Sequence, residues 1–93
     1  MPTRPSQNDP ERVAKWEFWR HVVGARIREL RVAKDMTQEA LALRSGVTRN
    51  VLADVEHGRR GLLYERLFDI AEALNVQVAD LLPESDGSSP SDQ

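Results

Sequence analysis

The side chains best suited to specific chemistry in this sequence lie between residues 49 and 54. Arg49, Asn50, Val51 and Asp54 fall within six positions. An arginine fork pairs with guanine, an asparagine amide pairs with adenine, a carboxylate accepts from the cytosine amino group, and a valine can contact the thymine methyl. These four residues are therefore candidates for reading base edges. The alternative is that they are solvated side chains on the outer face of an amphipathic helix.

Two short helices separated by one glycine are expected to position this set. Thr37 and Thr48 are residue types that cap helix N-termini, although Ala40 replaces the acid of a full capping box. Gly46 follows the first helical segment, where a left-handed residue closes a helix. Ala42 is small at the position where the second helix would cross. This pattern predicts a helix-turn-helix, whose second helix enters the major groove of DNA.

Several further segments occur in a familiar order and spacing. They are Arg26–Arg31, Met36–Glu39, Val55–Arg60, Ile70–Val76 and Asp80–Leu82. With these segments, residues 23–82 resemble the phage-repressor and Cro-like helix-turn-helix regulators, the Xre family. The resemblance implies an all-α fold: a compact five-helix lambda-repressor-like DNA-binding domain with helices near 20–33, 37–45, 48–57, 63–74 and 78–82.

The resemblance also implies contacts to the DNA backbone. In the family the glutamine that opens the second helix binds a phosphate, and Gln38 occupies that position. A helix N-terminus offers unpaired N–H groups and a favourable dipole to an anion. The alternative is that Gln38 is an ordinary exposed residue at a helix start. The predicted phosphate-binding residues are Thr37, Gln38, Thr48, His57, Arg59 and Arg60.

A structural ion pair between Arg31 and Glu56 follows from the same resemblance. In the family, such a pair holds the first helix to the third. Removal of one partner from a partly buried pair costs about 3–5 kcal/mol. Loss of Arg31 is therefore expected to unfold the domain rather than to remove a DNA contact.

The composition indicates one small domain and no enzyme. The 93 residues, 40% of them hydrophobic, provide one helical core, and the absence of cysteine excludes disulfides and thiolate metal sites. His21 and His57 are far apart in sequence and have no neighbouring nucleophile with a paired carboxylate, so we predict no catalytic residue, metal or cofactor. No signal peptide or membrane-spanning segment is recognisable, which predicts a cytoplasmic protein with no membrane partner.

The charge is unevenly distributed along the chain. The net charge is −2, which taken alone argues against a nucleic-acid partner. Residues 20–60, however, carry nine basic and five acidic groups, whereas residues 61–93 carry one basic and seven acidic groups. The predicted recognition segment is therefore basic, and this distribution would turn it toward double-stranded DNA.

Apolar residues after Gly61 depart from the family pattern. Leu63 stands where most relatives have a polar residue capping the fourth helix, and an apolar side chain cannot fill that role. Leu62, Leu63, Tyr64 and Phe68 are candidates for a homodimer interface, which would set two recognition helices about one DNA turn, roughly 34 Å, apart. The alternative is that they pack within the domain.

The two ends of the chain lie outside the family resemblance. We expect a disordered arm over residues 1–9, a helical extension over 10–22 that could continue into the first domain helix with a bend at Gly24, and an acidic disordered tail over 83–93. The extension carries Trp16, Phe18 and Trp19. Three hypotheses compete for these aromatics: packing against the domain, contact with a second copy or a protein partner (Trp16 and Trp19 above all), and a minor-groove or ligand role.

Taken together, these features predict a homodimeric transcriptional regulator, with repression as its main mode, that binds a pseudo-palindromic operator. An antitoxin or a restriction-modification controller would have the same DNA-binding mode. A protein-interaction module that kept the fold but lost operator binding is the alternative from another class. The chain has no room for a separate small-molecule domain.

Overall fold

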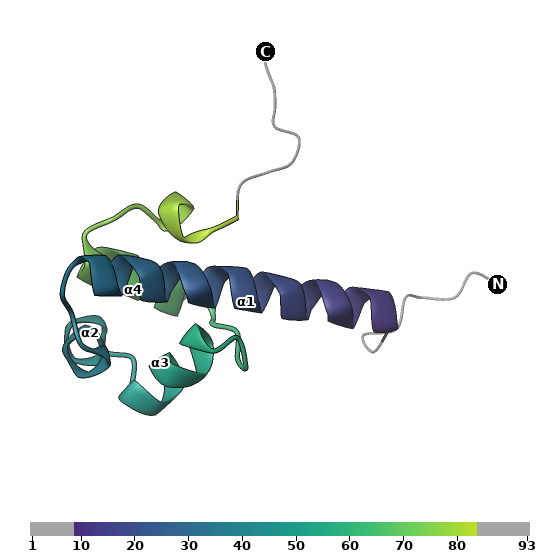
Figure 1. The fold of residues 1–93 in the computed structure, drawn as a ribbon, viewed down its shortest axis with the longest axis horizontal. Helices are drawn as coiled ribbons and strands as arrows, with labels where there is room; N and C mark the ends of the chain where they lie inside the picture. The colour runs from purple at the N-terminus through teal and green to yellow at the C-terminus, as the bar shows by residue number, and fades with distance from the viewer. Residues whose placement is uncertain (1–8, 84–93) are drawn as a thin grey trace, which may run out of the picture.

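The computed structural model describes residues 9–83, and within this range the chain is helical with no strand. The elements are α1 (Pro10–Ala33), α2 (Gln38–Ser45), α3 (Arg49–Glu56), α4 (Tyr64–Leu74) and the 3₁₀ helix η1 (Val78–Leu81) (Figure 1). The predicted all-α class is therefore confirmed. The disordered arm and the acidic tail predicted from the sequence fall, apart from Asp9 and Pro83, outside the described residues.

The fifth helix is shorter and tighter than predicted. The sequence suggested a helix over 78–82, but the structure has a single 3₁₀ turn that ends at Leu81. Its start is fixed by Gln77, whose backbone N–H donates to the Asp80 carboxylate at 3.0 Å. Pro83 disfavours helical backbone in the preceding residue, and Leu82 is accordingly extended. Local backbone chemistry therefore limits this element to one turn.

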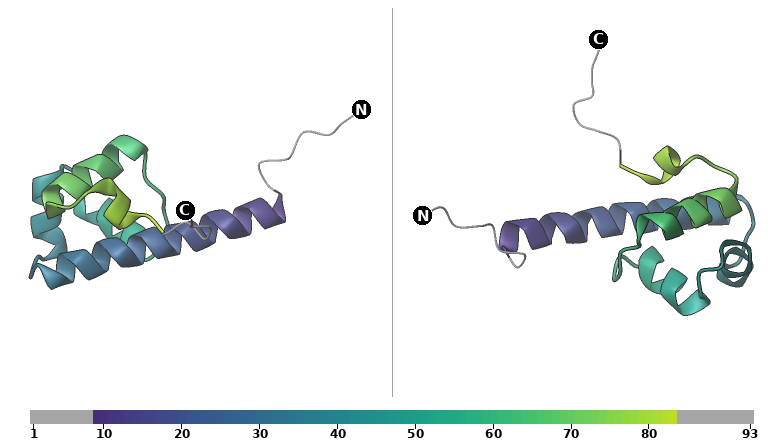
Figure 2. Two further views of the ribbon diagram at one scale, coloured as in Figure 1. Left: turned by 90° about the horizontal axis from the view of Figure 1, so that it is seen from above. Right: turned by 180° about the vertical axis from the view of Figure 1, so that it is seen from behind.

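The helical extension and the first domain helix form one continuous helix. Asp9 caps it by accepting the Glu11 N–H at 2.9 Å, and Pro10 occupies the first helical position. The bend predicted at Gly24 was wrong, because α1 runs through this residue without a kink (Figure 2). A side chain at Gly24 would overlap the carbonyl oxygen of Val55, so this glycine allows α1 and α3 to approach closely.

The hydrophobic core lies where α1 through α4 meet. α1 packs against α3, α2 packs against both α3 and α4, and η1 closes the core beside α1 and α4 (Figure 2). The buried side chains are Ile27, Leu41, Val47, Leu52, Val55, Ile70, Ala71, Leu74 and Leu81. The first half of α1 extends beyond this core, as Figure 1 shows. No helix among the described residues is long and apolar enough to cross a membrane.

The junction between α2 and α3 has the predicted capping geometry. The Thr37 hydroxyl accepts the Ala40 N–H at 3.0 Å, and the Thr48 hydroxyl accepts the Val51 N–H at 3.3 Å. Gly46 ends α2 with a φ of 78°, in the region that glycine enters without steric cost. These two capped helices and the single glycine form the helix-turn-helix unit.

Candidate nucleic-acid interface

The outer face of α3 begins with the two residues most suited to base contact. Arg49 and Asn50 form the first turn of α3, directly after the Thr48 cap, and both side chains are exposed. Val51, also predicted to contact bases, is half-buried and packs against the core. The free donors of the helix are therefore concentrated at its N-terminal end, the end that recognition helices direct at base edges.

Asp54 has a partner that the sequence did not reveal. Its Oδ1 lies 3.6 Å from Nη1 of Arg59, across the turn that ends α3. A lone carboxylate beside DNA would be repelled by phosphates, and the guanidinium offsets that charge. Because both side chains are well exposed, the pair contributes little to stability. Its main consequence is that Asp54 and Arg59 present a neutral pair rather than two independent charges.

A buried network connects α1, α2 and α3 behind this face. Arg31 and Glu56 lie in the ion pair implied by the resemblance: Nε donates to Oε2 at 2.7 Å and Nη2 donates to Oε1 at 3.0 Å. Arg31 Nη1 also donates to the Met36 carbonyl at 2.7 Å. Gln38 Nε2 donates to the same Glu56 Oε1 at 3.0 Å. Every oxygen of the buried Glu56 carboxylate is therefore satisfied, and α3 is held to the start of α2.

A shallow hollow lies between the start of α2 and the start of α3. It has a volume of about 420 Å³ and is lined by Arg31, Thr37, Gln38, Glu39 and Arg49. The Ala40 N–H is occupied by the Thr37 cap, but the N–H groups of Gln38 and Glu39 precede the first intrahelical acceptor. These N–H groups and the exposed guanidinium of Arg49 are the donors that this hollow offers to an anion, and the Glu39 side chain is the one acid that lines it.

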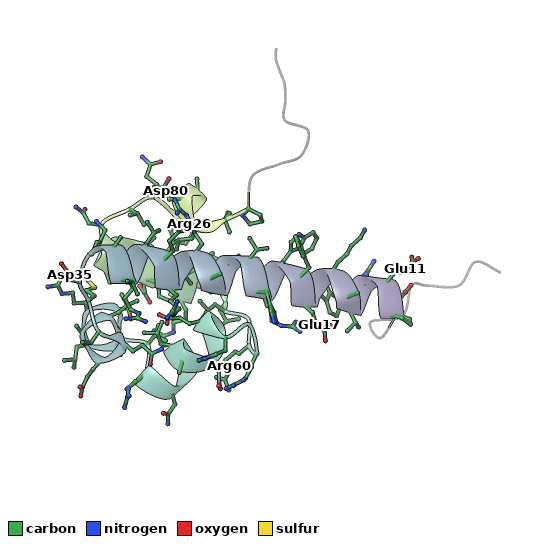
Figure 3. All side chains as sticks on the ribbon, in the orientation of Figure 1. Glu11, Glu17, Arg26, Asp35, Arg60 and Asp80 are labelled. Atoms are coloured by element: carbon green, nitrogen blue, oxygen red, sulfur yellow. The ribbon has the colours of Figure 1, made fainter. Side chains whose placement is uncertain are left out.

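His57, Arg60 and Thr48, which were also predicted to bind phosphate, differ in what their side chains can still donate. His57 Nδ1 lies 2.8 Å from the Ala53 carbonyl oxygen, so the neutral ring carries its proton on Nδ1 when it donates this hydrogen bond. Nε2 of that ring is then an acceptor, and it could donate to a phosphate only if the ring were protonated. Arg60 is exposed in the turn between α3 and α4 and lies on the side of α1 that faces α3 (Figure 3). Thr48 keeps a hydroxyl proton for an acceptor while its oxygen caps α3.

The candidate dimer residues divide into two exposed apolar regions. At the start of α4, Leu63, Tyr64 and Phe68 are between 56% and 72% exposed, and the Tyr64 and Phe68 rings pack edge to face at 6.4 Å. Leu63 precedes α4 and makes no capping hydrogen bond, as the sequence indicated. On the extension of α1, Trp16 and Trp19 are also exposed. Leu62 instead packs against the core.

The comparisons with known proteins agree with this geometry. The sequence pattern of the helix-turn-helix family matches residues 27–81. The chain is 36% identical over 67 residues to the HTH-type transcriptional regulator y4dJ of Sinorhizobium fredii, covering 72% of this chain and 87% of that one. The chain belongs to the helix-turn-helix family of transcriptional regulators, and the resemblance to Xre-type proteins is confirmed.

Two solved structures extend the match to three dimensions. The restriction-modification controller protein C.AhdI of Aeromonas hydrophila superposes with a TM-score of 0.67 at 36% identity, covering 68% of this chain and 96% of that one. The hypothetical transcription factor NHTF of Neisseria gives 0.67 at 28% identity and covers 89% of this chain and 86% of that one. The second match covers 89% of the chain, whereas residues 23–93 make up only about three quarters of it. The second match therefore includes part of the α1 extension.

Proposed function

We propose that this regulator binds a pseudo-palindromic operator as a homodimer, with the N-terminal turn of α3 in the major groove. The observation that carries the proposal is the exposure of Arg49 and Asn50 at the capped start of α3. Arg49 supplies a bidentate donor pair for guanine, and Asn50 supplies a donor and an acceptor for adenine. Asp54 contributes a base contact only when the DNA draws it away from Arg59, and Val51 contributes a limited apolar contact.

The hollow between α2 and α3 is the proposed phosphate site. The backbone N–H groups of Gln38 and Glu39 lie at the positive end of the α2 dipole, which favours an anion, and Arg49 also lines the hollow. The Gln38 amide holds Glu56, so its backbone rather than its side chain is the stronger phosphate donor. Thr37, Thr48, His57, Arg59 and Arg60 supply the flanking contacts, which fix the position of the domain without reading sequence.

The homodimer is proposed to form through the apolar surface at the start of α4. Leu63, Tyr64 and Phe68 are too exposed to contribute much to the stability of a monomer, and they lie together at the N-terminal end of α4. A two-fold arrangement would cover this surface with its own copy and place the recognition helices about one DNA turn apart, roughly 34 Å. Operator occupancy by such a dimer supports repression, in the cytoplasm, with no enzymatic step.

Control of a restriction-modification system is the second candidate. It is favoured by the 36% identity to C.AhdI, a restriction-modification controller, over nearly the whole of that protein. The DNA-binding mode would be the same, so the two candidates differ in target genes rather than in mechanism. Selection of bound sites followed by a search for them upstream of nuclease and methyltransferase genes separates them.

The experiment that tests the proposal is selection of bound duplexes from a random library at physiological salt. Wild-type protein should enrich a two-fold symmetric motif, and Arg49→Ala/Asn50→Ala should lose the enrichment while remaining folded by circular dichroism. Arg28→Ala is the matched control, because Arg28 is an exposed arginine on α1 and is not one of the proposed DNA-binding residues. No enrichment by folded wild-type protein would reject operator binding and favour a protein-interaction role.

A further inference from the structure

A small apolar hollow lies at the base of the α1 extension, away from the proposed base-reading face. It has a volume of about 160 Å³ and lies where α1, the end of α3, the following turn and α4 meet. Its apolar walls are the side chains of Trp19, Val23, Val55, Leu62 and Leu67. An engineered protein cavity of about 150 Å³ binds benzene. The hollow is therefore large enough for one ring or a short branched chain.

Two arginines and no acidic residue are among the residues that line this hollow. Arg20 lines it from α1 and Arg60 lines it from the turn after α3. No carboxylate is among the lining residues, and no ion pair joins either arginine to a carboxylate within residues 9–83. Glu17 precedes Arg20 by less than one helical turn but does not pair with it in the structure. Two positive charges beside apolar walls favour an occupant that carries a negative charge.

Arg20 also contains an unpaired buried donor. Among the described residues, its Nε is the one buried side-chain nitrogen or oxygen that has no hydrogen-bond partner. A buried N–H left without an acceptor costs free energy, and such groups in native proteins usually have a partner. A carboxylate is the acceptor that fits a guanidinium best, because its two oxygens match the donor fork.

We propose that this hollow binds a small monocarboxylate with a compact apolar body, of the size of benzoate. The carboxylate would be held by Arg20 and Arg60, and the apolar body would lie against Trp19, Val23 and Leu67. The positive charges of the two arginines select against neutral ligands. The helical extension thus acquires a role, since it supplies Trp19 and Arg20 to the site.

Binding at this site would be coupled to operator binding, a step that rests on the proposed function. Arg60 is a proposed contact to the DNA backbone and is also a proposed ligand for the carboxylate. One guanidinium cannot serve both anions fully, so the ligand weakens operator binding and, by linkage, the operator weakens ligand binding by the same factor. The site would make this chain sensitive to an acidic metabolite without a separate sensing domain.

The test of the site uses the full chain without DNA. Trp16→Phe leaves Trp19 as the only tryptophan, so its indole N–H resonance reports on the hollow. Titration with benzoate should shift this resonance saturably, and benzamide, which has the same shape without the charge, should bind at least about tenfold more weakly. Equal binding of benzamide and benzoate, or no saturable shift with benzoate in folded protein, would overturn the proposal.

Substitution of Arg20 provides the second arm. Arg20→Gln should weaken benzoate binding at least about tenfold, and Arg28→Gln, a matched loss of charge at an exposed position of α1 that does not line the hollow, should leave it unchanged. If Arg20→Gln protein bound benzoate as tightly as wild type, the proposed site would be wrong. If Arg20→Gln instead dissociates a dimer that does not bind benzoate, a carboxylate of the second copy is the occupant and the ligand proposal fails.

The coupling is tested separately with the selected operator. Benzoate should lower operator affinity by about fivefold or more, a typical size for coupled sites. Saturating benzoate with no change in operator affinity would refute the coupling while the ligand site stands. Failure to bind any DNA in the absence of benzoate would refute the proposed function, and the titration of Trp19 would still decide the ligand site.

Discussion

Arg31 and Arg20 occupy the same face of α1, three helical turns apart, and their surroundings differ. Arg31 is buried and has three donors in use, two to Glu56 and one to the Met36 carbonyl. Arg20 borders a hollow, and its buried Nε has no acceptor among residues 9–83. Residues 9–83 supply acceptors for the side-chain donors of Arg31, whereas they supply none for the Nε of Arg20. The surroundings of Arg31, near the C-terminal end of α1, hold the fold together, and the surroundings of Arg20, near the middle of α1, are those of the proposed ligand site.

The largest expected effect of this difference is on stability at Arg31. Arg31→Ala would leave the Glu56 carboxylate charged, buried and short of donors, so it should lower the free energy of unfolding by about 3–5 kcal/mol. Arg66→Ala, which removes an exposed pair with Asp69, should cost about 0–1 kcal/mol. Urea denaturation measures both. A loss at Arg31 as small as that at Arg66 would show that the buried network does not hold the domain together.

A smaller effect is expected at the contact between α1 and α3. A methyl group at Gly24 would overlap the Val55 carbonyl oxygen, so Gly24→Ala should destabilise the fold by about 1–3 kcal/mol despite the higher helix propensity of alanine. Gly61→Ala is the control, because a methyl group there meets only Arg20 at 3.8 Å and should change stability by less than about 0.5 kcal/mol. Thermal melts that rank the two variants in the opposite order would contradict the role assigned to Gly24.

The smallest effect on stability is expected at Arg20, and it separates the two arginines most clearly. Arg20→Met removes a guanidinium with an unpaired buried Nε, so the free energy of unfolding should stay unchanged or rise by up to about 1 kcal/mol without ligand. The same measurement on Arg31→Met should show a large loss. If Arg20→Met destabilised the protein as strongly as Arg31→Met, both arginines would be structural, and the contrast between Arg20 and Arg31 would disappear.

The sequence was sufficient for the features that depend on neighbouring residues. The Thr37 and Thr48 caps, the left-handed Gly46 and the helix start at Asp9–Pro10 are local preferences of backbone and side chain, and the structure has all of them. The pairing of Arg31 with Glu56 came from a family resemblance, which carries tertiary information that a single sequence lacks.

The features that sequence reasoning missed depend on how separate elements meet. In the sequence alone, Gly24 suggests a bend in the helix. Its role in the close contact between α1 and α3 is visible only when the position of α3 is known. Gln38 reads as a phosphate ligand, but its amide reaches Glu56 once α2 and α3 are placed. The pairing of Asp54 with Arg59 and the unpaired Nε of Arg20 likewise require side-chain positions that periodicity and composition do not define.

The measurement that tests the central claim most directly is the discrimination of wild-type and Arg49→Ala protein between the selected operator and a scrambled duplex. Binding is followed by fluorescence anisotropy at one physiological salt concentration. If the start of α3 reads base edges, Arg49→Ala should lose about 1–3 kcal/mol of discrimination while its affinity for the scrambled duplex changes far less. A folded Arg49→Ala protein that discriminates as well as wild type would contradict the assignment of α3 as the reading helix.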